Sequence, residues 1–180
     1  MFGTDGIRGV ANDTLRPELA LAVGRAAARV LGGGTFLLGR DTRVSGPMLE
    51  GALVAGLCSA GARVLRAGIL PTPAVAYLVG EVRANAGVVV SASHNPIEDN
   101  GIKFFGPDGR KLPDSVEARV EALLADDGPR PTGVDVGEVE DFPEAQELYL
   151  RHLLRYGPPV RGLRVVVDCA FGAAYRLAPR

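Results

Sequence analysis

The sequence predicts an α/β fold, a three-layer αβα domain built around a mostly parallel, mixed sheet. Between residues 17 and 90, amphipathic stretches with helical spacing alternate with short, nearly continuous apolar stretches. This alternation is typical of parallel strands covered by helices on both faces. The chain has 180 residues, 47% of them hydrophobic, which is enough to bury one substantial core without a disulfide or a structural metal.

The first half of the chain supplies the alternating elements. A helix is expected to begin at Pro17 and to end at the glycine run 32–34, because apolar residues recur at helical spacing between them. A second helix, capped by Ser45, should reach about Gly61, and a third should begin at Thr72. The strands predicted between these helices cover residues 35–39, 63–67 and 87–90.

After residue 90 the alternation stops. Residues 101–105 and 110–112 are expected to form a hairpin, because the Gly-Pro-Asp-Gly sequence between them favours a tight turn. Asp114 and Glu117 have the spacing of a capping box and predict the start of another helix.

The last third of the chain is expected to leave this domain. Residues 126–143 are acidic and rich in Gly and Pro, which predicts a surface connection, and a helix should follow over about 143–156. The apolar residues 163–167 predict a strand that cannot bury itself alone. We therefore expect residues 1–155 to form one domain, and residues 156–180 to be the truncated beginning of a second α/β domain.

Composition excludes several classes of function. The 20 basic and 21 acidic side chains give a net charge of −1, so no overall charge attracts nucleic acid or an anionic membrane. No uncharged stretch reaches the roughly 20 residues of a membrane helix, and the first residues lack the pattern of a signal peptide. The two cysteines have no CxxC spacing. We expect a cytoplasmic protein.

The polar loop at residues 91–96 is the predicted site of chemistry. In open parallel sheets, ligands bind beyond the carboxyl ends of the strands, and the predicted strand 87–90 delivers this loop to that edge. Because Pro96 restricts Asn95 to extended conformations, the Ser93 hydroxyl should be exposed. The Asp-Asn-Gly turn that follows would return the chain so that Lys103 can face Ser93.

A serine next to a histidine is compatible with two kinds of chemistry. A serine hydrolase needs a base, an orienting acid and an oxyanion hole, usually at a G-x-S-x-G turn, which is missing here. Phosphoryl transfer mainly needs positioned cations and hydrogen-bond donors. Ser93, His94, Asn95, Lys103 and the arginines can supply these, so we favour phosphoryl transfer, with a non-catalytic phosphosugar-binding module as the alternative.

Four segments resemble successive signatures of the α-D-phosphohexomutases. They are Phe-Gly-Thr-Asp-Gly-Ile-Arg-Gly at 2–9, Gly-Arg-Asp-Thr-Arg-Val-Ser-Gly at 39–46, Ser-Ala-Ser-His-Asn-Pro at 91–96 and Asp-Asn-Gly-Ile-Lys-Phe-Phe at 99–105. The Gly-Ile-Lys-Phe-Phe sequence at 101–105 is similar to that of the bacterial glucosamine branch of this family. A phosphomannomutase or a phosphoglucomutase is the nearest alternative.

The resemblance implies a role for each matching residue. Ser93 would carry a phosphoryl group, converting glucosamine 6-phosphate to glucosamine 1-phosphate through a 1,6-bisphosphate. Lys103 would be a general acid or base, His94 would hydrogen-bond or transfer a proton, and Arg8 would be a cation near the phosphoserine. Phosphate or substrate binding would involve Thr4, Asp41, Arg43 and Asn95.

The same resemblance implies the cofactors and partners. Mg²⁺ would be bound in part by the phosphate on Ser93, with its other ligands absent from this chain, and glucosamine or glucose 1,6-bisphosphate would be the activator or intermediate. The partner would be a small aminosugar phosphate, and the product would supply the synthesis of cell-wall precursors. No nucleic acid or membrane partner is expected, and a homodimer is compatible with the sequence. Because the family's enzymes have four domains, we expect this chain to be an inactive fragment.

Overall fold

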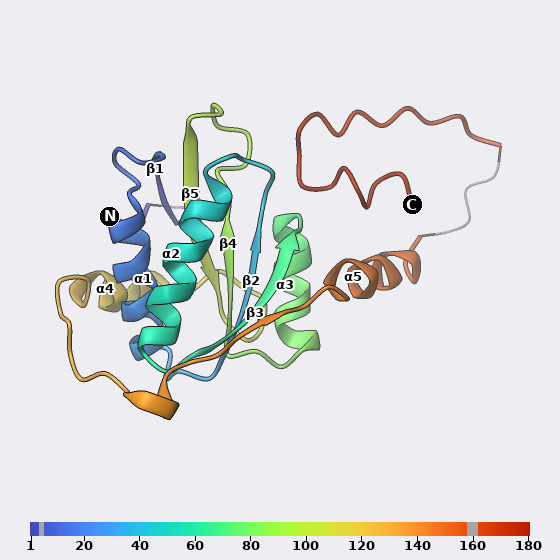
Figure 1. The fold of residues 1–180 in the computed structure, drawn as a ribbon. Coiled ribbons are helices and arrows are strands. Elements are labelled where there is room, and N and C mark those ends of the chain that lie inside the picture. The colour runs from blue at the N-terminus through green and yellow to red at the C-terminus, as the bar shows by residue number, and fades with distance from the viewer. Residues whose placement is uncertain (4–5, 158–161) are drawn as a thin grey trace.

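A mixed sheet with the strand order β1-β5-β4-β2-β3-β6 forms the centre of the molecule (Figure 1). The computed structural model describes residues 1–3, 6–157 and 162–180. β2 pairs in parallel with β3 and β4, and β3 pairs in parallel with β6, whereas β5 is antiparallel to both β4 and β1. The strands are β1 (Ile7–Val10), β2 (Thr35–Arg40), β3 (Arg63–Ile69), β4 (Ala86–Val90), β5 (Asp99–Phe105) and β6 (Val139–Asp141).

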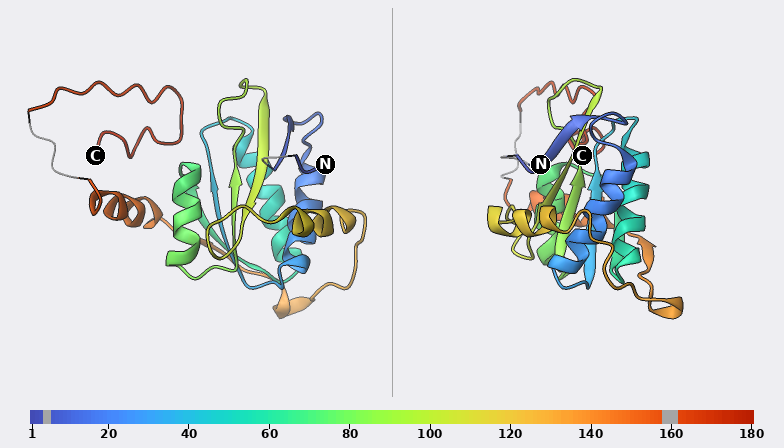
Figure 2. Two further views of the ribbon diagram at one scale, coloured as in Figure 1. Left: turned by 180° about the vertical axis from the view of Figure 1, so that it is seen from behind. Right: turned by 90° about the vertical axis from the view of Figure 1, so that its left-hand side faces the viewer.

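Helices cover both faces of this sheet (Figure 2). α1 and α2 pack on one face and α3 and α5 on the other, while α4 packs against α1. Side chains alternate accordingly along β2, where Phe36 and Leu38 join the first core and Leu37 the second. The three-layer α/β fold is therefore confirmed. The helices are α1 (Pro17–Val30), α2 (Gly46–Ser59), α3 (Thr72–Glu81), α4 (Asp114–Ala122), α5 (Ala145–Leu154) and the 3₁₀ turn η1 (Gly133–Asp135).

α1 and α2 approach each other closely enough to bring their backbones into contact. A Cβ atom built on Gly24 would lie 2.5 Å from the carbonyl oxygen of Leu53, and one built on Gly56 would lie 2.1 Å from that of Leu21. Any larger side chain would therefore collide with the backbone of the facing helix. Gly51, on the exposed side of α2, meets nothing within 4 Å.

The edges of the sheet differ from the sequence prediction. Two edge strands, β1 and β6, were not predicted. β6 lies within the expected surface connection 126–143. The second arm of the predicted hairpin is reduced to a single bridge between Phe105 and Lys111. Residues 163–167 are not a strand, because no neighbouring strand in the described part of the chain pairs with them.

Two predicted helix caps are also wrong, because other partners compete for their side chains. Ser45 precedes α2, but its Oγ accepts a hydrogen bond from Asn100 Nδ2 at 2.9 Å and does not cap the helix. Asp114 is the first residue of α4, and its carboxylate lies 3.0 Å from Lys111 Nζ. Glu117 is almost fully buried and binds the same ammonium at 2.7 Å. Both carboxylates therefore bind the Lys111 ammonium, and neither forms the hydrogen bonds of a capping box.

No helix in the described ranges has the length and apolar character that a membrane span requires.

Candidate functional site

The predicted site loop lies at the carboxyl ends of the parallel strands. β4 ends at Val90 and leads directly into the loop, while β2 leads into the neighbouring polar segment that begins at Asp41. The Asp41 N–H donates to the Val90 carbonyl at 3.0 Å, and the Ser91 N–H donates to the Gly101 carbonyl at 2.9 Å. α2 and α3 both begin at this edge, so their N-terminal N–H groups favour an anion there.

Ser93 is exposed on this loop, as expected, and its backbone is in the left-handed region with φ +56°. Non-glycine residues rarely adopt this conformation, which costs about 1–3 kcal/mol and persists only where the surroundings enforce it. The Ser93 N–H donates to Ser91 Oγ at 3.0 Å, and its carbonyl accepts from Arg43 Nη2 at 3.1 Å. Its Oγ lies 3.4 Å from His94 Nδ1.

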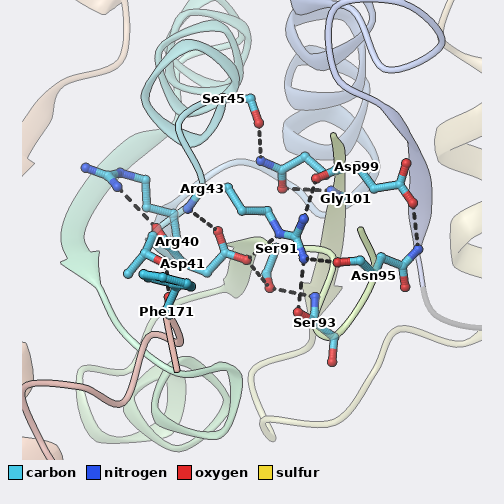
Figure 3. A network of polar contacts seen from close by, with 12 residues as sticks. Arg40, Asp41, Arg43, Ser45, Ser91, Ser93, Asn95, Asp99, Gly101 and Phe171 are labelled. Atoms are coloured by element: carbon cyan, nitrogen blue, oxygen red, sulfur yellow. Dashed lines mark hydrogen bonds and ion pairs between the residues drawn. The ribbon is translucent and has the colours of Figure 1, made fainter. Parts of the chain in front are cut away.

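Arg43 donates hydrogen bonds to four backbone carbonyls of the loop and of the turn that follows it (Figure 3). Its Nη2 donates to the carbonyls of Ser93 and Asn95, and its Nη1 donates to the carbonyls of Pro96 and Asp99. Its Nε donates to Asp41 Oδ2 at 3.1 Å. The Arg43 side chain is 9% exposed, and its guanidinium directs all of its N–H groups at protein acceptors.

Asp41 connects Arg43 to the amide of Ser93. Its Oδ1 accepts from the Arg43 backbone N–H at 3.0 Å, and its Oδ2 accepts from the Ser91 hydroxyl at 2.7 Å. Because Ser91 Oγ also accepts a hydrogen bond from the Ser93 N–H, this hydroxyl links the buried carboxylate to the loop and forms a hydrogen-bond relay between them. A single network therefore holds both backbone polar groups of Ser93.

Asn95 connects the loop to the first strand of the sheet. Its Oδ1 accepts from Arg8 Nη1 at 2.9 Å, and its Nδ2 donates to Asp99 Oδ2, also at 2.9 Å. Arg8 is brought to this position by the pairing of β1 with β5, in which Arg8 lies opposite Gly101. The structure thus places Arg8 beside the serine loop through a strand that the sequence did not predict.

Lys103 and Thr4 are the two remaining predicted site residues. Lys103 lies on β5 opposite Val89, on the face that packs against α3, and its Nζ lies 5.5 Å from the centre of the Phe105 ring. It does not line the cleft described below. Thr4 is outside the described residues.

A cleft of about 890 Å³ opens beside the loop, a size that suits a small-molecule ligand. The loop residues Ser91, Ser93, His94 and Asn95 line it, as do Asp41, Arg43 and, at the start of α3, Thr72. Residues 169–173 and Tyr175 also line the cleft, and the Phe171 carbonyl accepts a hydrogen bond from Thr42 Oγ1. The cleft therefore combines an exposed hydroxyl, an imidazole and a helix N-terminus.

The described residues do not by themselves offer a site for a metal ion. They contain no group of three or more His, Cys, Asp or Glu side chains arranged to hold a cation. Any metal bound here would therefore depend on ligands other than such a cluster.

Ser91 and Asp99 both take part in the loop network, although the sequence did not single them out as site residues. The signal for Ser91 was its place directly after β4 and two residues before Ser93, because short polar side chains there commonly bond to nearby backbone. The signal for Asp99 was weaker, since its contact with Asn95 requires the loop to fold back on itself.

Similar proteins of known family cover the whole of this chain. Residues 1–130 match the family model described as phosphoglucomutase/phosphomannomutase, alpha/beta/alpha domain I. The chain is 56% identical over 188 aligned positions to a phosphoglucosamine mutase of Desulforudis audaxviator, covering 100% of this chain and 42% of that protein. It is 57% identical over 187 positions to one from Mycolicibacterium paratuberculosis, with the same shares.

Solved structures give the same result. A phosphoglucomutase/phosphomannomutase family protein from Burkholderia thailandensis superposes with a TM-score of 0.82 at 32% identity, covering 99% of this chain and 40% of that one. A putative phosphomannomutase from Thermus thermophilus gives a TM-score of 0.76 at 29% identity, covering 88% of this chain and 36% of that one. This chain thus spans less than half the length of the relatives it matches. It belongs to the phosphoglucomutase/phosphomannomutase family, and residues 1–130 match that family's α/β/α domain I.

Proposed function

We propose that this chain forms the phosphoryl-carrying part of a phosphoglucosamine mutase, with Ser93 as the carrier. The observation behind this proposal is the Ser93 hydroxyl, which is exposed at the cleft on a backbone fixed by the loop network. The names of the curated relatives support glucosamine phosphate as the substrate. The domain division at residues 155 and 156 belongs to the same proposal, since residues 163–167 lie outside the sheet.

The proposed reaction moves one phosphoryl group at a time. Phosphorylated Ser93 gives its phosphoryl group to O1 of glucosamine 6-phosphate: the Oγ–P bond breaks, an O1–P bond forms, O1 loses its proton and Ser93 Oγ takes one up to become a hydroxyl. The bisphosphate then returns its 6-phosphoryl group to Ser93: the O6–P bond breaks, an Oγ–P bond forms, Ser93 Oγ loses its proton and O6 takes one up. Ser93 is phosphorylated again, and glucosamine 1-phosphate leaves.

The neighbouring residues supply the electrostatics and the proton transfer that this reaction needs. The N-terminus of α3 favours the phosphate dianion, and Arg8 adds a positive charge close to the loop. His94, with Nδ1 3.4 Å from Ser93 Oγ, is placed to exchange a proton with that oxygen. Lys103 is proposed as the second proton-transfer group.

The proposed Mg²⁺ would offset the negative charge of the phosphoryl group during transfer. A phosphate on Ser93 would offer it an oxygen ligand. The described residues add no ligand cluster of their own, so the remaining ligands would come from elsewhere in the protein.

The test is a coupled assay for glucosamine 1-phosphate with the full-length protein, Mg²⁺ and a hexose 1,6-bisphosphate. We expect turnover by the full-length protein, none by Ser93→Ala and none by residues 1–180 alone. Equal rates for Ser93→Ala and the parent protein would contradict the proposal.

A second candidate is a phosphomannomutase or phosphoglucomutase, which the family name and the Thermus thermophilus structure favour. The same assay with mannose and glucose phosphates separates the two, because the preferred substrate has the higher kcat/KM.

A further inference from the structure

We infer that Arg43 is a positioning residue that fixes the conformation of the carrier loop, and that it does not bind the sugar phosphate. The effect of Arg43 on catalysis rests on the proposed function. Its effect on the loop rests only on its contacts with Ser93, Asn95, Pro96, Asp99 and Asp41.

The guanidinium of Arg43 has no N–H group left for a ligand. An arginine side chain has five N–H donors, and the structure gives one acceptor to Nε, two to Nη1 and two to Nη2. Arg43 lines the cleft, but its side chain is only 9% exposed. A phosphate could bind Arg43 only by displacing loop carbonyls, which would leave those carbonyls without a partner.

The contacts of Arg43 act on the serine through the backbone. Nη2 binds the Ser93 carbonyl directly, and the carboxylate of Asp41 positions Ser91, whose hydroxyl binds the Ser93 N–H. The peptide groups on both sides of the left-handed residue are therefore held by one connected group of side chains. This explains how the unfavourable backbone conformation persists, and it fixes where the hydroxyl points.

A lysine cannot take over this role. Its ammonium offers three donors from one point, whereas the four carbonyls and the carboxylate around Arg43 require a planar group with five donors. Arg43→Lys therefore keeps the positive charge and removes the planar set of five donors. The variant thus separates the electrostatic attraction of a substrate from the positioning of the loop.

The experiment measures loop order and catalysis in the full-length protein with three variants. Arg43→Lys tests the guanidinium, and Ser91→Ala removes the hydroxyl relay without altering charge. Arg29→Lys is the matched control, because Arg29 also binds a backbone carbonyl and a carboxylate, those of Asp126, but lies on α1 away from the loop.

The first readout is amide hydrogen exchange without ligand. In Arg43→Lys we expect the loop amides at 93, 95 and 99 to exchange about tenfold faster or more, with β2 unchanged. Ser91→Ala should accelerate the Ser93 amide, which loses its acceptor. Arg29→Lys should leave all of these rates as in the parent protein.

The second readout is the division of the kinetic effect between kcat and KM. Displacement of the carrier hydroxyl should lower kcat by about 100-fold in Arg43→Lys and change KM for the sugar phosphate by less than about threefold. A rise in KM with normal exchange in the loop would make Arg43 a ligand-binding residue and overturn the inference.

The two proposals can fail separately. If the parent protein turns over no hexose phosphate, the proposed function fails, while the exchange rates still decide whether Arg43 holds the loop. If Arg43→Lys does not fold, Ser91→Ala gives the decision, and an unchanged exchange rate at Ser93 in that variant would overturn the relay.

Discussion

The side-chain amide of Asn95 donates a hydrogen bond to Asp99 Oδ2 across 2.9 Å, closing the loop between them. The opposite end of the same amide accepts from Arg8 at 2.9 Å. While residue 99 is a carboxylate, residue 95 must be an amide, because one end donates to that carboxylate and the other accepts from a guanidinium.

Exchanging the two polar groups of this pair should restore what a single substitution breaks. Asn95→Asp places two carboxylates at hydrogen-bond distance and should lower the free energy of unfolding by about 1–3 kcal/mol. Adding Asp99→Asn supplies the donor again and should recover most of that loss. Urea unfolding of the single and double variants measures both values, and a purely additive double variant would contradict the pairing.

The contact between α1 and α2 predicts opposite effects for two glycines of one helix. Gly56→Ala would bring its Cβ within 2.1 Å of the Leu21 carbonyl oxygen and should destabilise the protein by about 2–3 kcal/mol. Gly51→Ala meets open space and should stabilise it by about 0.5–1 kcal/mol through helix propensity. Thermal and urea unfolding of both variants provide the test. Similar effects from the two substitutions would show that the helices are not in backbone contact.

The buried carboxylate of Glu117 predicts that Lys111 stabilises the fold. Lys111→Met would leave that carboxylate without its ammonium partner and should cost roughly 2 kcal/mol. Adding Glu117→Gln should recover much of this loss, because the uncompensated charge is then gone. A double variant less stable than Lys111→Met would contradict this explanation.

The same pair predicts a pH dependence. The hydrogen bond from Lys111 to Glu117 raises the pKa of the lysine above its ordinary 10.5. A group whose pKa is raised on folding contributes its full stabilisation below the unfolded pKa and loses it as pH rises through the folded value. The stability difference between the parent protein and Lys111→Met should therefore stay constant through neutral pH and shrink only above about pH 10.5. A difference that already shrinks near neutral pH would contradict it.

The left-handed backbone of Ser93 predicts that glycine is tolerated there better than alanine. Ser93→Gly removes the steric conflict at φ +56°, whereas Ser93→Ala retains it. We expect the glycine variant to be more stable than the alanine variant by about 1 kcal/mol in urea unfolding, with neither able to carry phosphate. Equal stability of the two variants would show that the loop stores no strain.

The central part of the fold could be predicted because its signals are local. Residues 17–90 combine apolar periodicity with Gly and Pro at the ends of elements, and the structure has the expected helices and strands there. The edge strands β1 and β6 depend on pairing with distant partners, and all three residues of β6 are exposed. Residues 163–167 show the converse, since apolar character alone does not make a strand without a neighbour.

The position of the site could also be predicted, but its internal contacts could not. Chain topology places the loop after β4 at the carboxyl edge of the sheet, which the sequence indicated. Arg43 and Ser93 are 50 residues apart, and spacing does not tell whether a guanidinium faces a ligand or a ring of carbonyls. Only the folded loop shows that Arg43 faces carbonyls.

The backbone angle at Ser93 also bears on which amino acid can serve as a phosphate acceptor. Threonine offers a comparable hydroxyl, but a β-branched residue is a genuine outlier at positive φ. Ser93→Thr would have to leave the left-handed region and carry its oxygen away from His94. Shape therefore restricts this position to an unbranched alcohol, even where the chemistry of two alcohols would be interchangeable.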